Sequence, residues 1–137
     1  MKANPTVMLW SVVLLMLAGS HTASAQKGGM IVRISEIGIY PDSLEKYKAI
    51  LKEEADASVR LEPGVIAIFP MYQQKDSMQI RILEIYANKE AYQSHIKSAQ
   101  FQKYKTTTLS MVKSLQLTDM NAIDTKTMKK IFRKLKK

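Results

Sequence analysis

Hydrophobic and polar residues between positions 30 and 123 follow two periods, one typical of strands and the other of helices. Four segments are rich in β-branched and aromatic residues, which predicts strands at 30–40, 65–72, 79–87 and 115–123. Three segments between them carry apolar residues at helical spacing, which predicts helices at 42–59, 89–97 and 99–113. The resulting order, β-α-β-β-α-β with the second helical part in two pieces, predicts a ferredoxin-like α+β sandwich.

Residues that start and stop helices support several of these boundaries. Asp42, with Glu45 three residues later, forms a capping-box pattern at the start of the first predicted helix. Pro63 and Gly64 are expected to end that helix, and Asn88 is a typical N-cap for the next one. Only a short polar loop separates the second and third strands, which predicts that they pair antiparallel.

The second predicted strand is apolar on both of its faces. One alternating set comprises Val65, Ala67, Phe69 and Met71, and the other comprises Ile66, Ile68, Pro70 and Tyr72. An antiparallel sheet with one face in water should instead alternate apolar and polar residues. Helices can cover only one face in this topology, so we expect a second copy of the chain to cover the other. The hollow formed by that homodimer is where we expect a ligand to sit.

The first 25 residues have the pattern of an export signal. Lys2 precedes an apolar run over 7–18, and Ala23-Ser24-Ala25 matches a small-residue cleavage site. The run is shorter than the ~20 residues that a comfortable membrane span needs. We therefore expect cleavage after Ala25 and a periplasmic or secreted protein, with an uncleaved helix as the alternative.

Composition excludes several classes of function. Hydrophobic residues make up 46% and charged residues 24% of the 137-residue chain, as in ordinary globular proteins. The absence of cysteine excludes disulfides, thiol nucleophiles and cysteine metal sites, and no nucleotide-binding glycine motif is present. With only two histidines, one inside the predicted signal, we expect no histidine-based metal site; a carboxylate metal site stays open as an alternative, although no cluster of carboxylates suggests one.

The net charge of +9 is concentrated at the C-terminus. Residues 26–125 hold all 12 acidic residues and 13 of the Lys and Arg residues, so a domain at 26–124 is close to neutral and is not expected to bind nucleic acid. The tail, 125–137, holds seven cations, and four apolar residues fall on one helical face of it: Met128, Ile131, Phe132 and Leu135. Such a basic amphipathic helix could contact an anionic membrane weakly, and a solvated tail is the alternative.

Several short segments occur in an order that points to a known family. They are Tyr40-Pro41, Glu62-Pro63-Gly64-Val65, the strand residues 82–87, Glu90 to His95, and 98–104. With these segments, residues 30–123 resemble the antibiotic biosynthesis monooxygenase (ABM) family, dimeric α+β barrels that include quinol monooxygenases. The resemblance implies oxygenation of a small electron-rich aromatic, such as a quinol, without flavin or metal.

The chemistry implied by this resemblance needs a base, an apolar pocket and hydrogen bonds to a phenolate. His95 is the expected base and Glu84 a buried carboxylate that takes part in proton transfer. The expected substrate-binding residues are Tyr72, Tyr86, Phe101 and Tyr104. The alternatives are a structural histidine, an ion pair of Glu84 across the dimer, and tyrosines that only fill the core.

Two positions depart from the family pattern. Members often carry a histidine directly before Phe101, where this chain has Gln100, and haem-degrading relatives have a histidine ligand where this chain has Lys105. A protonated lysine cannot readily bind iron, which disfavours haem degradation. The rival functions are a non-catalytic small-molecule-binding or stress-related dimer module, and an isomerase or decyclising enzyme on the same scaffold.

Overall fold

The computed structural model describes residues 29–135, so the predicted signal at 1–25 lies outside the described residues. Its elements are β1 (Ile31–Ile39), η1 (Pro41–Ser43), α1 (Leu44–Leu61), β2 (Val65–Tyr72), β3 (Gln79–Tyr86), α2 (Lys89–His95), α3 (Ala99–Thr108), η2 (Leu109–Met111), β4 (Val112–Met120) and α4 (Thr125–Lys134), where η is a one-turn 3-10 helix. No helix of this described part is long and apolar enough to cross a membrane.

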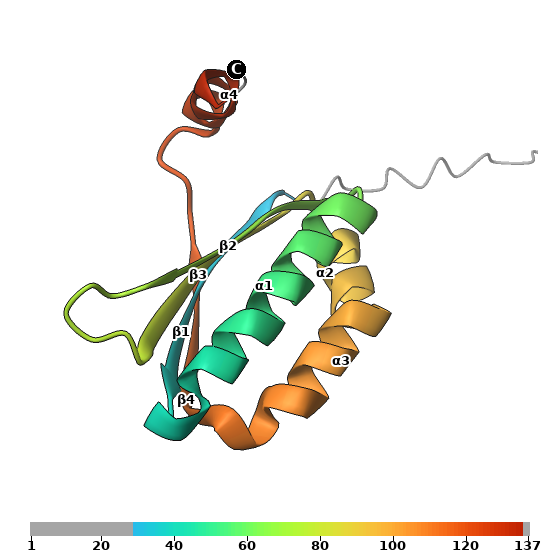
Figure 1. Ribbon diagram of the computed structural model, residues 1–137. Helices are drawn as coiled ribbons and strands as arrows, with labels where there is room; N and C mark the ends of the chain where they lie inside the picture. The colour runs from blue at the N-terminus through green and yellow to red at the C-terminus, as the bar shows by residue number, and fades with distance from the viewer. Residues whose placement is uncertain (1–28, 136–137) are drawn as a thin grey trace, which may run out of the picture.

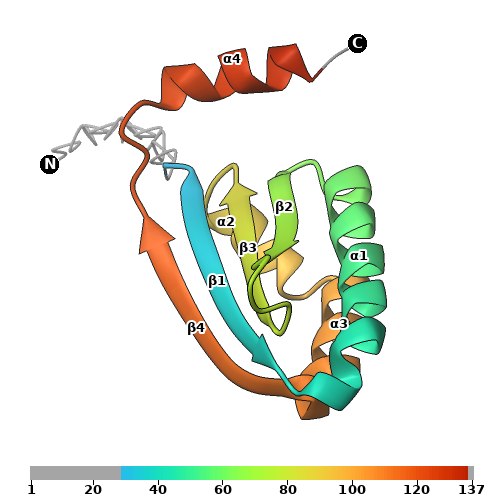
Figure 2. The same ribbon diagram turned by 60° about the vertical axis from the view of Figure 1, so that its left-hand side comes forward.

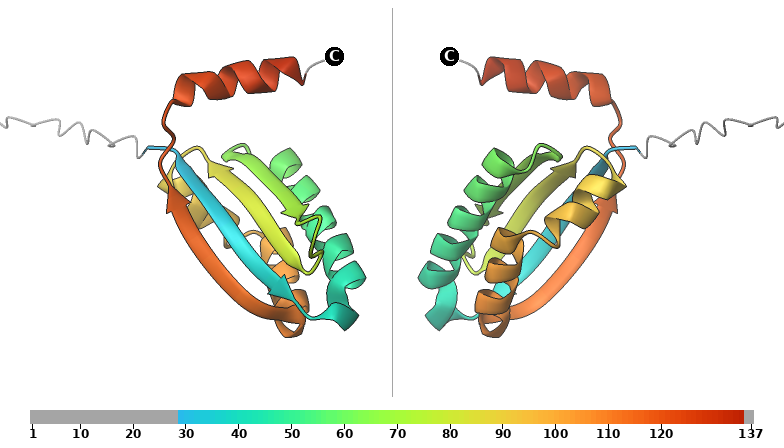
Figure 3. Two further views of the ribbon diagram at one scale, coloured as in Figure 1. Left: turned by 90° about the vertical axis from the view of Figure 1, so that its left-hand side faces the viewer. Right: turned by 90° about the vertical axis from the view of Figure 1, so that its right-hand side faces the viewer.

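The four strands form one antiparallel sheet in the order β2-β3-β1-β4. The helices α1, α2 and α3 all lie against one face of it (Figure 1). The other face, which we call the open face, carries none of these helices, as the left view of Figure 3 shows. The predicted ferredoxin-like α+β fold is therefore confirmed.

The first residues of β2 do not keep the simple alternation that the sequence predicts. Val65 is opposite Tyr86 and Ala67 is opposite Ile85, so Ile66 is an extra residue in a β-bulge. The bulge turns Val65 to the helix side, where it is 4% exposed, instead of grouping it with Phe69, which is 58% exposed. Large apolar side chains remain exposed on the open face: Ile66, Phe69, Met71 and Met120.

The helix starts follow local signals, with one exception. The Asn88 side chain accepts a hydrogen bond from the Ala91 backbone N–H at 2.8 Å, which confirms it as the cap of α2. The capping box expected at Asp42 is absent, because Pro41 already begins the turn η1 and Asp42 lies inside it. β4 begins at Val112, three residues earlier than predicted, because α3 ends at Thr108.

The core lies between α1 and the helix side of the sheet. Tyr47 and Leu51 of α1 are buried against Ile37 and Ile39 of β1, together with isoleucines of β2 and β3. Gly64 lets α2 pack closely at the end of this core, since a Cβ atom there would lie 2.4 Å from the Cβ of Ala91. This contact fixes the helix whose last residue is His95.

Candidate functional site

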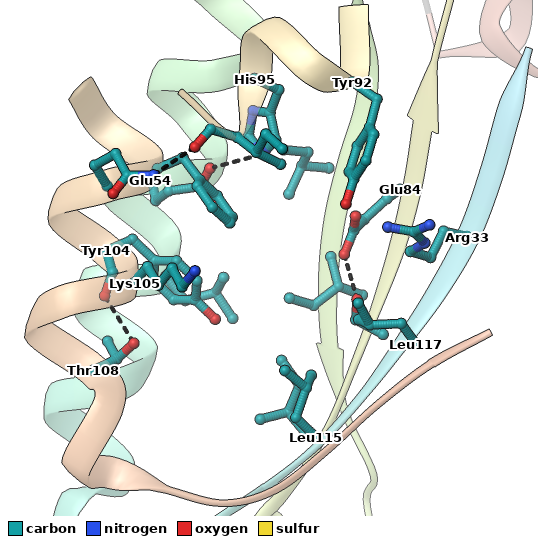
Figure 4. Close-up of a pocket in the computed structure, with 18 of the residues that line it drawn as sticks. Arg33, Glu54, Glu84, Tyr92, His95, Tyr104, Lys105, Thr108, Leu115 and Leu117 are labelled. Carbon is teal, nitrogen blue, oxygen red and sulfur yellow. Dashed lines mark hydrogen bonds and ion pairs between the residues drawn. The ribbon is translucent and has the colours of Figure 1, made fainter. Parts of the chain in front are cut away.

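A cavity of about 560 Å³ lies between the helix side of the sheet and α3. Its sheet wall includes Ser35, Glu84 and Leu117, and its helix wall includes His95 and Tyr104 (Figure 4). This volume is in the range of pockets for small organic ligands. The cavity lies inside one protomer, and not in a hollow between two sheets as the sequence led us to expect.

The cavity opens beside β4. In Figure 2 this strand forms the edge of the sheet farthest from α1. Leu115 and Leu117 line the cavity from β4 and are 59% and 51% exposed. The helices thus cover β2, β3 and part of β1, and they leave an apolar mouth at the opposite edge.

His95, the expected base, is held between two carboxylates. It ends α2 and is 2% exposed. Its Nδ1 lies 3.1 Å from Glu62 Oε1, and its Nε2 lies 3.8 Å from Glu54 Oε1. Because a carboxylate can only accept, Nδ1–H donates to Glu62, and the lone pair of a neutral ring then lies on Nε2.

Neighbouring side chains fix this row of three acid–base groups, which we call the Glu54–His95–Glu62 row. Gln100 donates its amide N–H to Glu62 Oε1 at 2.6 Å. The His95 ring packs between two aromatic rings, with centroid distances of 5.2 Å to Tyr86 and 4.8 Å to Phe101. The imidazole therefore has one orientation, which a catalytic base requires.

Glu54 is a buried acid that our reading of the sequence missed. It is 5% exposed, lines the cavity and accepts a hydrogen bond from Ser58 Oγ at 2.8 Å. Burial raises the pKa of its carboxyl group above the ordinary range. The spacing of residues in the sequence could have revealed its burial. Glu54 follows Leu51 by three residues and precedes Ser58 by four, which places it on the inward face of α1.

Glu84 lines the opposite wall and accepts hydrogen bonds from two hydroxyls. Ser35 Oγ donates to its Oε1, and Tyr86 donates to its Oε2 at 2.9 Å. In the described protomer its partners are thus hydroxyl groups and not a cation. The nearby Arg33 donates to Asp119 at 2.7 Å and lies 4.8 Å from the ring centre of Tyr92.

The tyrosines of the site are neutral hydrogen-bonding groups. Tyr104 lines the cavity, and its hydroxyl lies 2.6 Å from the hydroxyl of Tyr47. Burial raises the pKa of Tyr104 to about 12, and burial beside Glu84 raises the pKa of Tyr86 further above its usual value. These phenols can donate hydrogen bonds near neutral pH but are not bases there.

Four of the predicted site residues besides His95 line this cavity, and one does not. Glu84, Tyr86, Phe101 and Tyr104 all contribute to its walls. Tyr72 lies outside it, 54% exposed at the last residue of β2, with the Lys48 ammonium 5.0 Å from its ring centre. Tyr72 is therefore not part of this cavity, because this end of the edge strand lies away from the cavity wall, and its predicted role in substrate binding stays a prediction.

The described residues show no metal-binding geometry. Across 29–135 no group of three or more His, Asp or Glu side chains could hold a metal ion. The two positions that depart from the family pattern have defined places: Gln100 supports Glu62, and Lys105 lines the cavity from α3 (Figure 4).

Comparison with known proteins gives one family. Residues 30–107 match the family model described as antibiotic biosynthesis monooxygenase. A crystal structure of a provisionally named antibiotic biosynthesis monooxygenase from Bacteroides thetaiotaomicron is 45% identical, with a TM-score of 0.69 over 70% of this chain and 91% of that one. No curated protein matches the chain.

More distant structures share the fold. A provisionally named monooxygenase from Lactobacillus acidophilus is 26% identical, with a TM-score of 0.67 over 68% of this chain and 44% of that one. A protein from Nitrosomonas europaea, provisionally named an antibiotic biosynthesis monooxygenase, is 18% identical, with a TM-score of 0.67 over 72% of this chain and 94% of that one. At 18% identity the likeness extends to the fold alone.

Proposed function

Because the chain belongs to the antibiotic biosynthesis monooxygenase family, we propose that it oxygenates a small electron-rich aromatic, such as a quinol, with O₂ and without flavin or metal. The observation that carries the proposal is the Glu54–His95–Glu62 row, a buried acid–base group on the wall of an apolar cavity. Perturbed, buried acid–base groups in a cavity are typical of catalytic sites.

In the proposed reaction the substrate supplies the electrons. Removal of a phenolic proton gives a phenolate, which reduces O₂ more readily than the phenol does. For a hydroquinone, one oxygen atom forms a new C–O bond on the ring and the other leaves as water. The ring becomes a hydroxyquinone, so the substrate loses the four electrons that O₂ gains, and no external reductant is needed.

We assign the proton transfer to His95. Its Nε2 accepts the phenolic proton, and Glu62 stabilises the resulting imidazolium through Nδ1–H. Burial raises the pKa of Glu54, whose Oε1 lies 3.8 Å from Nε2, and so favours the neutral form of the acid beside the imidazole. Tyr104 can donate its O–H to a phenolate oxygen when Tyr47 donates to Tyr104, whereas the single O–H of Tyr86 is already donated to Glu84.

The test is oxygen uptake by protein lacking residues 1–25, with a panel of hydroquinones and anthrones. We expect uptake by the wild-type protein and a loss of about 10²–10⁴-fold in kcat for His95→Asn, which is the usual contribution of a general base. Tyr72→Phe is the matched control, because Tyr72 lies outside the cavity. Unchanged turnover in His95→Asn would remove histidine from the mechanism.

A second candidate is a non-catalytic small-molecule-binding module. The observation in its favour is that Gln100 stands where relatives often carry a histidine, and its amide serves only to support Glu62. The same panel separates the two functions. Tight binding of an aromatic compound with no oxygen uptake for any substrate would favour the binding module.

We also propose that the mature protein is exported and works as a homodimer. The pattern of an export signal over 1–25 favours a periplasmic or extracellular location. Proteins of this family commonly form dimers, and a second copy on the open face would cover the exposed Ile66, Phe69 and Met71. The cavity is on the opposite side of the sheet and would remain accessible beside β4.

A further inference from the structure

The C-terminal helix α4 stands apart from the domain. After β4 the chain passes through 121–124 and then runs as α4, clear of the sheet and of α1 to α3 in every view (Figures 1, 2 and 3). Asp124 caps its start, accepting from the Lys126 backbone N–H at 2.9 Å and from Thr127 Oγ1 at 2.5 Å. The helix is therefore specified by its own residues and not by packing on the domain.

The surface of α4 is divided into an apolar and a basic part. Met128 and Ile131 of α4 and Leu135, the residue directly after it, recur at helical spacing, and Ile131 and Leu135 are 56% and 74% exposed. The cations of the helix are Lys126, Lys129, Lys130, Arg133 and Lys134. None of these five makes an ion pair with any residue of 29–135, and the stretch 126–137 contains no acidic residue.

We propose that α4 docks the protein on an anionic lipid surface, lying in the plane of the interface. Its basic part complements the charge of the headgroups, and its apolar stripe enters the acyl boundary. At 1.5 Å per residue its ten residues extend about 15 Å, which is too short to span a bilayer. A nucleic acid would be attracted by the cations alone and would leave the apolar stripe in water.

This docking has a consequence that rests on the proposed function. Only residues 121–124 separate α4 from β4, the strand that borders the mouth of the cavity. Lipid binding would therefore hold the mouth close to a phase in which apolar quinols dissolve. Lipid binding and oxygen uptake are measured in separate experiments. A protein that does not bind lipid can therefore still be tested for oxygenation, and a protein without oxygenase activity can still be tested for lipid binding.

The experiment is co-sedimentation of the mature protein with vesicles of pure phosphatidylcholine and of phosphatidylcholine mixed with phosphatidylglycerol. We expect binding only to the anionic vesicles, weakened by salt. Lys129→Glu with Lys130→Glu should lower the partition coefficient by at least about tenfold, since one cation near the surface accounts for about fivefold. The same charge change at exposed lysines of the domain, Lys52→Glu with Lys113→Glu, should leave it within about twofold.

A second pair of variants tests the apolar stripe. Ile131→Ser with Leu135→Ser keeps every charge of α4 and should also lower vesicle binding by at least about tenfold. Circular dichroism of each variant checks that the domain is folded. Equal partition of the wild-type protein and the Lys129/Lys130 variant would overturn the proposal. So would unchanged binding of the Ile131/Leu135 variant, or tighter binding to duplex DNA than to anionic vesicles.

Discussion

Glu54 is the residue whose protonation links the stability of the protein to its proposed chemistry. Its carboxyl group is buried among cavity residues, and burial favours the neutral acid, so its pKa is raised in the folded state. The folded protein therefore binds this proton more tightly than the unfolded chain does. The stabilisation is fully present below the ordinary pKa of glutamic acid and is lost as the pH rises through the raised value.

This gives a prediction for Glu54→Gln. A glutamine keeps the shape and the acceptor for Ser58 but cannot ionise. As the pH rises from about 4.5, the free energy of unfolding of the wild-type protein should therefore fall relative to that of Glu54→Gln. Urea denaturation at a series of pH values measures it, with Glu53→Gln as the control at a neighbouring exposed position. A difference that does not change with pH would contradict the raised pKa.

At the scale of elements, α2 carries His95 and is set in place by a glycine at the start of β2. A methyl group added at Gly64 would meet both the Cβ of Ala91, at 2.4 Å, and its Cα, at 3.3 Å. Neither atom is the end of a flexible side chain, so the helix as a whole has to move. That movement would separate His95 from Glu54 and Glu62, which belong to α1 and its C-terminal cap.

We expect Gly64→Ala to destabilise the protein by roughly 1–3 kcal/mol, the usual cost of overpacking, and to lower activity together with stability. The compensating change is Ala91→Gly, which removes the methyl group that Gly64→Ala would strike. In a double-mutant cycle the two substitutions should partly cancel, as measured by chemical denaturation. Strict additivity would mean that the close packing of Gly64 on Ala91 is unimportant.

The element order could be predicted because local residues mark it, whereas the site depended on long-range packing. Asn88 and the Pro63-Gly64 pair are boundary signals that need no tertiary context. The bulge at Ile66 gave no such signal, because both alternating sets of β2 are apolar and either register buries apolar residues. For the same reason the sequence did not reveal on which side of the sheet the cavity lies.

Some site residues could be predicted from residue type alone, whereas others depend on tertiary packing. His95 and Glu84 stand out as ionisable groups among apolar neighbours, so residue types were enough to find them. Tyr72 and Tyr86 are the same residue type, so the sequence could not distinguish them. Tyr86 is buried and Tyr72 is exposed because the helices cover only part of the sheet. Glu62 drew attention only as part of the segment Glu62-Pro63-Gly64-Val65, although its carboxylate contacts His95, 33 positions later in the sequence.

For the whole molecule, the open face of the sheet leads to a prediction about assembly. Phe69 is 58% exposed at a face that we propose a second copy covers, so Phe69→Lys should bury a charge at the interface and give monomers. Leu61→Lys is the control, since Leu61 is 57% exposed at the end of α1, on the helix side. Sedimentation should give the mass of two chains for the wild type and the control. A wild-type monomer at micromolar concentration would contradict the proposed dimer.

The central claim is that the cavity carries out oxygenation with O₂ and the substrate's own electrons. The most direct measurement is mass spectrometry of the quinone product after turnover of a hydroquinone under isotopically heavy O₂. We predict one labelled oxygen atom per product molecule, formed by the wild-type protein and lost in His95→Asn. Product without label, or labelled product formed equally well by His95→Asn, would contradict the proposed mechanism.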